Sequence, residues 1–154
     1  MFNNKGEEFD KCVYDYIDAK IKRGDFFISS PFMKLFKKKG YFSHERGKNI
    51  ITDISIEIYV EDPSKNNIVK PSIIIIVECK DYANAVSVDD VEEFHAKLQQ
   101  IGDDNTKGII VARENLFQEG AINYAVSKGI MMMAFREEIY RCYNSQTISS
   151  RTYT

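Results

Sequence analysis

Tryptophan is absent from this 154-residue sequence, cysteine is scarce, and no long apolar run occurs. Phenylalanine and tyrosine are frequent instead, which predicts an aromatic-rich core. Cys12, Cys79 and Cys142 lack the spacing of a metal-binding motif. No stretch reaches the roughly 18 apolar residues of a membrane span, and no signal-peptide pattern occurs. We therefore expect no membrane association and a reducing, cytoplasmic location.

Two further absences limit the partners of the chain. The formal net charge is only -2, which argues against a surface coated with basic groups, so a nucleic acid would have to bind a local basic patch. No glycine-rich phosphate loop is present, so we expect no nucleotide cofactor. The length and the 44% apolar content predict one globular domain over 1–154, with a core at about 5–135 and a C-terminal helix or tail at 136–154.

The N-terminal third is predicted to contain two helices. From Lys5 to Lys22, apolar residues recur at helical spacing, and Asp10 borders this apolar stripe. Ser30 and Pro31 resemble the start of a second helix that ends at Gly40. This segment carries the lysines Lys34, Lys37, Lys38 and Lys39. They form either a solvated face or a phosphate-contacting one.

Residues 50–60 change to a period of two, which predicts a strand with one apolar and one polar face. The apolar face carries Ile54, Ile56, Ile58 and Val60, and the polar face carries Asp53, Ser55, Glu57 and Tyr59. We expect Glu57 to face solvent. The turn formers at 61–67 lead into a second strand, so the pair is predicted to be an antiparallel hairpin.

That second strand, 71–80, contains five consecutive β-branched residues and is predicted to be buried on both faces. It ends in Glu78-Cys79-Lys80. Strand alternation places Glu78 and Lys80 on one face and Cys79, a small core residue, on the other. An antiparallel return brings Asp53 close to this end. A surface salt bridge between Glu78 and Lys80 is the simpler alternative.

The remaining chain predicts alternating helices and strands. Ser87 and Asp90 resemble a capping box for a helix that continues to Ile101, followed by a strand at 107–112, a helix at 116–127 and a strand at 129–135. His95 is expected to be half-buried with a partner, and Met131 to Met133 to be core residues.

The order of these features resembles the PD-(D/E)XK nuclease superfamily, in particular its restriction-endonuclease-like and Mrr-like members. The resemblance rests on Gly6 and Asp10 in the first helix, Asp53 on a strand, and Glu78-Cys79-Lys80 closing the next strand. It covers about Lys5 to Phe135 and implies an α/β fold with a central mixed sheet of four to five strands, an antiparallel hairpin and flanking helices. The sequence departs from the family pattern in two ways. The first-helix acid is usually Glu, and Glu8 competes with Asp10, while Thr52 stands where the family often has Pro.

The resemblance also implies a site and a chemistry. Phosphodiester hydrolysis needs a nucleophile made from water and a positive charge near the phosphate, and a hard divalent cation supplies both. Asp53, Glu78 and the backbone carbonyl of Cys79 would hold Mg²⁺, with Mn²⁺ as a substitute, because these cations prefer oxygen ligands. Lys80 would orient or deprotonate the attacking water, and Asp10 would be an accessory acid.

The implied function is a Mg²⁺-dependent DNA endonuclease of restriction or of defence and repair type. It would act as a homodimer or with a separate specificity domain or subunit. DNA contacts are expected from the lysines Lys34, Lys37, Lys38, Lys39 and Lys97, although a solvated face also explains Lys97. Gln99 is a further candidate near the site. The alternatives are a catalytically inactive nuclease-fold module that binds nucleic acid or a partner protein, and an assembly subunit in which Glu78 and Lys80 are only ion-paired.

Overall fold

The computed structural model describes residues 5–65, 67, 70–81, 84–102, 104–113, 117–135 and 140–143, and their side chains except those of Lys5 and 140–143. The elements are α1 (Lys5–Arg23), β1 (Met33–Lys37), β2 (Gly40–Ser43), β3 (Lys48–Ile51), β4 (Ile54–Ile58), β5 (Ile73–Lys80), α2 (Val88–Ile101), β6 (Thr106–Arg113), α3 (Glu119–Lys128), β7 (Met131–Phe135) and β8 (Tyr140–Tyr143).

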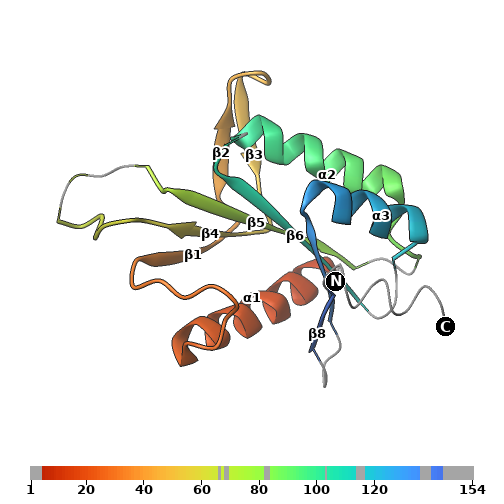
Figure 1. Cartoon of the computed structure of the whole chain (residues 1–154), viewed down its shortest axis with the longest axis horizontal. Coiled ribbons are helices and arrows are strands. Elements are labelled where there is room, and N and C mark those ends of the chain that lie inside the picture. Colours follow the sequence, from red (N-terminus) through yellow and green to blue (C-terminus); the bar gives the residue numbers. More distant parts are fainter. Residues whose placement is uncertain are drawn as a thin grey trace.

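A mixed sheet in the order β1-β4-β5-β6-β7-β8 forms the centre of the fold, and β2 and β3 form a separate two-stranded hairpin. β4 and β5 are antiparallel, whereas β5, β6 and β7 are parallel. α1 covers one face of the sheet, and α2 and α3 cover the other (Figure 1). The predicted α/β, restriction-endonuclease-like fold class is confirmed.

β5 lies inside the sheet and is buried on both faces, as its unbroken apolar run predicts. Ile75 and Val77 pack in the apolar cluster beneath α1. Ile74 and Ile76 point to the other face and pack in the cluster beneath α2 and α3. Residues at the C-terminal end of β5 therefore reach one or the other side of the sheet according to strand alternation.

The predicted second helix near Ser30 is wrong, because residues 33–37 form the edge strand β1. Ser30 Oγ accepts a hydrogen bond from the Phe32 backbone N–H at 3.3 Å, but no helix follows it. β1 pairs antiparallel with β4, and Leu35 lies opposite Ile56. A helix of two turns is only marginally stable in water, whereas pairing at the edge of a sheet satisfies the same backbone groups and buries apolar side chains.

The predicted strand over 50–60 is divided into β3 and β4. A corner at Thr52 and Asp53 separates them, and this corner bonds to the β1–β2 turn: the Thr52 N–H donates to the Lys39 carbonyl and the Lys38 N–H donates to the Asp53 carbonyl, each at 3.0 Å. The β2–β3 hairpin consequently projects away from the central sheet (Figure 1). Val60, predicted on the apolar face, lies beyond β4 and is 78% exposed.

The later elements agree closely with the sequence. His95 is half-buried, and its Nδ1 lies 3.2 Å from the hydroxyl of Tyr124. Met132 and Met133 are buried, and Met131 is packed against the α1 cluster. Residues 140–143, predicted as part of a helix or tail, form strand β8 against β7. The rest of 136–154 lies outside the described residues.

None of the helices that the structure describes has the length and apolar character needed to cross a membrane.

The capping box at α2 is present and gives a direct stability prediction. Ser87 Oγ accepts from the Asp90 N–H at 3.3 Å, and the Asp90 carboxylate accepts from the Ser87 N–H at 2.9 Å. We expect Ser87→Ala to lower the free energy of unfolding by about 1 kcal/mol, because an N–H at the helix start loses its acceptor. Urea unfolding followed by circular dichroism measures this change. Ser127→Ala serves as the control, because it removes an exposed hydroxyl of α3 that donates to the Tyr124 carbonyl at 2.7 Å and caps no helix start. An equal loss in both variants would contradict the cap.

Candidate active site

Asp53 is positioned by the corner that precedes β4. Its Oδ2 accepts a hydrogen bond from the backbone N–H of Cys79 at 2.9 Å, and its Oδ1 accepts one from Lys38 Nζ at 3.1 Å. Because β4 begins at Ile54, which pairs with Val77, the carboxylate of Asp53 takes a backbone donor of β5 that lies beyond the last residue paired with β4. The antiparallel return thus brings Asp53 to the end of β5, as the hairpin prediction required.

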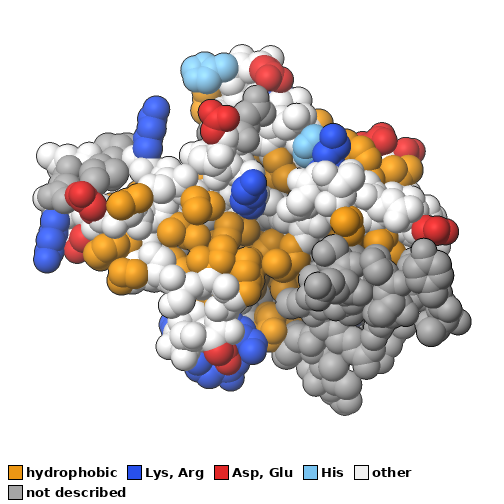
Figure 2. Space-filling model, in the orientation of Figure 1, with side chains coloured by type: hydrophobic (Ala, Val, Ile, Leu, Met, Phe, Trp, Pro, Cys, Tyr) orange, Lys and Arg blue, Asp and Glu red, His pale blue; other side chains and the backbone are white. Residues whose placement is uncertain are grey.

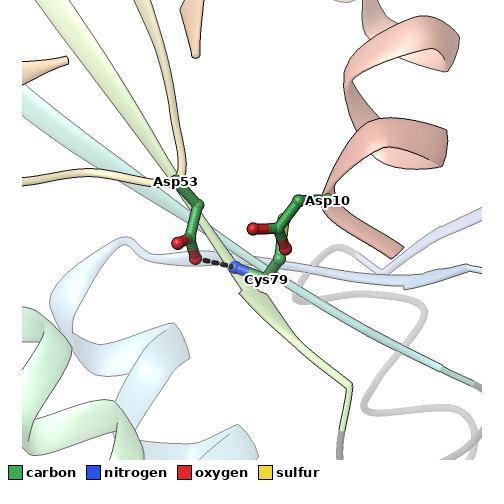
Figure 3. A group of neighbouring side chains, drawn as sticks. All are labelled: Asp10, Asp53 and Cys79. Carbon is green, nitrogen blue, oxygen red and sulfur yellow. Dashed lines mark hydrogen bonds between the residues drawn. The ribbon is translucent and has the colours of Figure 1, made fainter. Parts of the chain in front are cut away.

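Asp10 of α1 lies beside Asp53. One ligand atom from each of Asp10, Asp53 and Cys79 falls within 4.8 Å of the others, and Figure 3 shows the carboxylates and the thiol drawn together from α1, the corner and β5. Asp10 is buried at 9% exposure, whereas Glu8 is exposed. Of the two acids considered for the site in this helix, Glu8 and Asp10, it is Asp10 that lies beside Asp53 and Cys79.

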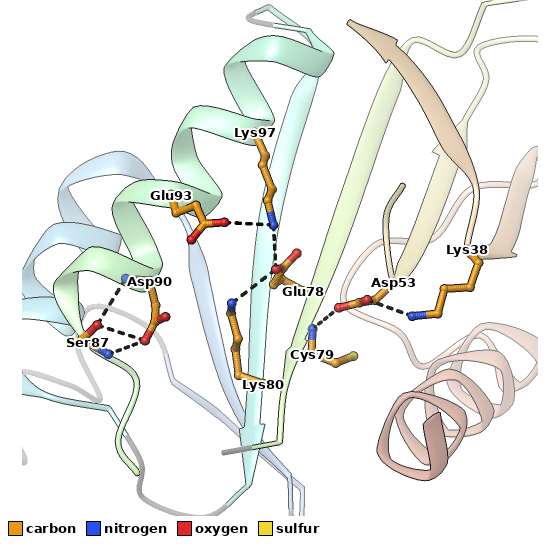
Figure 4. A network of polar contacts seen from close by, with 9 residues as sticks. All are labelled: Lys38, Asp53, Glu78, Cys79, Lys80, Ser87, Asp90, Glu93 and Lys97. Atoms are coloured by element: carbon orange, nitrogen blue, oxygen red, sulfur yellow. Dashed lines mark hydrogen bonds and ion pairs between the residues drawn. The ribbon is translucent and has the colours of Figure 1, made fainter. Parts of the chain in front are cut away.

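Glu78 and Lys80 lie on the α2 side of β5. Glu78 Oε1 is 3.4 Å from Lys80 Nζ and 3.2 Å from Lys97 Nζ of α2 (Figure 4). The side chains of Glu78 and Lys80 are only 13% and 10% exposed, so they do not form a surface salt bridge. Removing charges from water to this extent is costly, and each charge here has an opposite charge beside it.

Lys97 therefore faces the same end of β5 as Glu78. It also lies 3.6 Å from Glu93, one helical turn earlier in α2. Gln99 is exposed and lines a separate cavity of about 240 Å³ with His95 and Lys128. The sequence proposed both Lys97 and Gln99, and the structure brings only Lys97 to Glu78.

The side chain of Cys79 faces both the apolar core and two carboxylates. It packs against the cluster under α1, as predicted for a small core residue, and points away from Glu78 and Lys80. Its sulfur also lies beside Asp10 and Asp53, which sequence patterns did not predict. Burial, followed by the charges of those carboxylates, raises the pKa of this thiol well above its usual range. The thiol is therefore protonated at neutral pH.

Lys38 lies between the two aspartates, a position that the sequence did not predict. Its Nζ is 2.8 Å from Asp10 Oδ2 and 3.1 Å from Asp53 Oδ1. The side chain remains 50% exposed. Burial lowers the pKa of Lys38, but the hydrogen bonds and charges of Asp10 and Asp53 outweigh it and raise the pKa above its usual range. The ammonium is therefore charged at every physiological pH.

Glu57 was predicted to face solvent, and that prediction is wrong. Its side chain is 3% exposed and accepts hydrogen bonds from Lys39, from the Tyr41 hydroxyl at 2.7 Å and from the Tyr59 hydroxyl at 2.6 Å. The β2–β3 hairpin and the β1–β2 turn supply Tyr41 and Lys39 and so cover this face of β4. The available signal was the neighbouring run 73–77: a strand apolar on both faces implies that its hairpin partner is also covered.

The predicted lysine surface is thereby divided. Lys38 and Lys39 point to acids, whereas Lys34 and Lys37 are exposed and lie over the rings of Tyr59 and Tyr14 at 5.4 and 4.7 Å. On the face seen in Figure 2, hydrophobic side chains gather over the central strands, and the Lys and Arg side chains are spread around them. The basic groups on this face do not form one continuous stripe.

Known proteins provide an independent comparison. The model of the Mrr_cat family, described as restriction endonuclease, matches residues 30–140. No curated protein matches the chain. The crystal structure of a protein of unknown function, AF1548, superimposes with a TM-score of 0.54 at 11% identity, which covers 97% of this chain and 65% of the other. The similarity supports the fold alone. The family match covers most of the chain and includes Asp53, Glu78 and Lys80, and the chain therefore belongs to the Mrr_cat restriction endonuclease family.

Proposed function

We propose that the chain is a Mg²⁺-dependent endonuclease domain that hydrolyses DNA phosphodiester bonds in restriction or in defence and repair. The observation that carries this proposal is the ammonium of Lys38 held between the carboxylates of Asp10 and Asp53, next to the end of β5 where Glu78 and Lys80 lie. Family membership supports a nuclease domain. The metal, the DNA substrate and the biological role are the proposal.

The residues at this end of β5 fit a hard divalent cation. Two carboxylates already place oxygen atoms around one positive group, at 2.8 and 3.1 Å from Lys38 Nζ. Mg²⁺ and Mn²⁺ prefer these oxygen donors to the soft sulfur of Cys79. We assign Asp53, Glu78 and the Cys79 carbonyl as ligands. Asp10, whose carboxylate lies within 4.8 Å of that of Asp53, would be an accessory acid beside the same cation. When bound, the cation would activate water and offset the charge of the phosphate.

Lys80 is assigned the role of base or charge stabiliser. Its ammonium lies 3.4 Å from Glu78 Oε1, and the side chain is only 10% exposed. A pre-positioned cation in a partly dry site interacts with developing negative charge more strongly than it would in water. Lys97 shares the same carboxylate oxygen at 3.2 Å and would hold Glu78 or contact a phosphate.

Charge balance at the site favours an anionic substrate. Asp10, Asp53 and Glu78 supply three negative charges, the more exposed Glu93 beside Lys97 adds a fourth, and Lys38, Lys80 and Lys97 supply three positive charges. A divalent cation would therefore leave a net positive site, which attracts the phosphates of nucleic acid. Because the overall charge is -2, we propose that a second copy of the chain or a separate specificity domain contributes to holding duplex DNA.

One observation favours a second candidate, a nuclease-fold module that binds nucleic acid or a protein without cleaving it. Each of the three carboxylates at the site already has a lysine partner. Because these ion pairs neutralise the carboxylates, the site does not need a metal ion for its stability. A nuclease-fold protein that had lost its activity would retain the same ion pairs.

Plasmid cleavage separates the two candidates. We expect supercoiled plasmid to be nicked or linearised with Mg²⁺ or Mn²⁺, and EDTA to stop the reaction. Asp53→Ala should reduce the rate at least about 100-fold, because a carboxylate that places the cation is lost. Asp15→Ala, which removes an exposed acid of α1, should leave the rate unchanged.

Two results would contradict the enzyme. Cleavage that does not depend on metal, or that is equal in wild type and Asp53→Ala, would reject it for this chain. Retained affinity for a DNA fragment in the absence of cleavage would instead support the binding module.

A further inference from the structure

Both backbone hydrogen bonds and ion pairs place Lys38 beside Asp10 and Asp53. Lys38 lies in the turn between β1 and β2 with φ of 52°, a left-handed backbone conformation that residues other than glycine adopt only infrequently. Its N–H donates to the Asp53 carbonyl at 3.0 Å, and the neighbouring Thr52 N–H donates to the Lys39 carbonyl at 3.0 Å. The turn and the Asp53 corner are therefore joined through main-chain bonds that do not depend on the lysine side chain.

The two lysines of this turn have different partners. Lys39 bonds to Glu57, inside the network that covers β4. Lys38 bonds to Asp10 and Asp53, and half of its side chain is open to solvent. Of these two lysines, only Lys38 contacts both aspartates, and its side chain is 50% exposed to solvent.

We propose that Lys38 is a built-in counter-cation: its ammonium occupies the cation position of Asp10 and Asp53 in the metal-free protein and must leave before a metal ion binds there. This inference deepens the proposed function, on which it rests, by adding control of metal loading. Without metal, the ammonium offsets the repulsion between two neighbouring carboxylates. With metal, the side chain swings into solvent while the main-chain bonds keep the turn in place.

Competition of this kind lowers the apparent affinity for metal, because part of the binding free energy is used to break two ion pairs. Lys38→Met removes the ammonium but retains most of the stem. We expect it to bind Mn²⁺ about tenfold more tightly than wild type in calorimetric titration, since the two ion pairs of Lys38 no longer compete with the metal. Lys38→Arg retains the charge and should bind no more tightly than wild type.

Lys37→Met is the matched control. Lys37 is the adjacent lysine, and it lies over the Tyr14 ring at 4.7 Å instead of at the aspartates. If loss of a nearby positive charge were sufficient, Lys37→Met would raise the affinity as much as Lys38→Met does, and that result would overturn the inference. Unchanged affinity in Lys38→Met would also overturn it.

Thermal unfolding gives a second measurement. Metal-free Lys38→Met should melt at a lower temperature than wild type, because Asp10 and Asp53 lose their counter-charge, and saturating Mn²⁺ should raise its melting temperature more than it raises that of wild type. An equal rise in the two proteins would count against displacement.

The outcomes distinguish this inference from the proposed function. Tighter metal binding by Lys38→Met without cleavage by any form would retain the counter-cation and reject the nuclease. Metal-dependent cleavage with equal affinities would retain the nuclease and reject the counter-cation. If neither wild type nor Lys38→Met binds Mn²⁺, both are rejected.

Discussion

Lys80→Met is expected to reduce the rate of metal-dependent DNA cleavage about a thousand-fold, the scale of losing a positioned acid–base or charge-stabilising group. The substitution retains the aliphatic stem, which is largely buried at the end of β5, and removes only the ammonium beside Glu78. Packing should therefore be retained. Initial rates of plasmid nicking, measured with an unchanged circular dichroism spectrum, give the comparison.

Lys107→Met is the control for general loss of positive charge, because Lys107 is exposed on β6. It should cleave at nearly the wild-type rate. Lys97 is the residue that could substitute for Lys80, since both ammonium groups contact Glu78 Oε1. If Lys80→Met retains more than a third of the wild-type rate and Lys97→Met is inactive, the assigned role belongs to Lys97.

Glu57→Ala is expected to lower the free energy of unfolding by about 3 kcal/mol, a large share of the roughly 5–15 kcal/mol that stabilises a domain. The change leaves the Tyr59 hydroxyl without its buried acceptor and Lys39 without its counter-charge, and the Tyr41 hydroxyl retains only Ser55 Oγ, at 2.9 Å. Chemical denaturation measures the loss. Glu45→Ala, at an exposed position in the β2–β3 turn, should change stability by less than about 0.5 kcal/mol.

The stability that Glu57 contributes should also depend on pH. Burial raises its pKa, but hydrogen bonds from Lys39, Tyr59 and Tyr41 outweigh burial and hold the pKa below the ordinary value of 4.5. A carboxyl whose pKa is lower in the folded than in the unfolded state stabilises the fold above the unfolded value and loses this contribution as pH falls through the folded one.

Glu57→Gln, which has no ionisable group at this position, should therefore be less stable than wild type at pH 7. The difference should narrow as the pH falls below 4.5. A difference that stays constant from pH 7 to the acid limit would show that the charge of Glu57 contributes nothing to stability.

Local sequence patterns were sufficient to predict α1, β5 and the start of α2. The spacing of Phe9, Val13 and Ile17 predicted α1, and all three side chains are buried. The β-branched run predicted β5, and Ser87 with Asp90 predicted the start of α2. These features depend on side chains a few residues apart, so the sequence contains them directly.

β1 shows where local signals fail. Serine and proline are favoured residue types at the start of a helix, and Ser30 Oγ does accept a hydrogen bond from the Phe32 N–H. The segment nevertheless pairs with β4, about 20 residues later in the chain. Helix propensity predicts local structure only weakly, and here the hydrogen bonds between β1 and β4 outweigh it.

The sequence by itself determined the strand that carries Glu78 and Lys80, the opposite direction of Cys79, and the presence of acids in the first helix and before β4. Alternation along one strand is a local property, which explains this success. Only the tertiary structure decided that Asp10 reaches the site in place of Glu8, that Glu57 is buried, and that Lys38 lies between Asp10 and Asp53. Lys38 is 28 positions from Asp10 and 15 positions from Asp53 in the sequence. Contacts across such separations depend on how the β1–β2 turn, the Asp53 corner and α1 pack together.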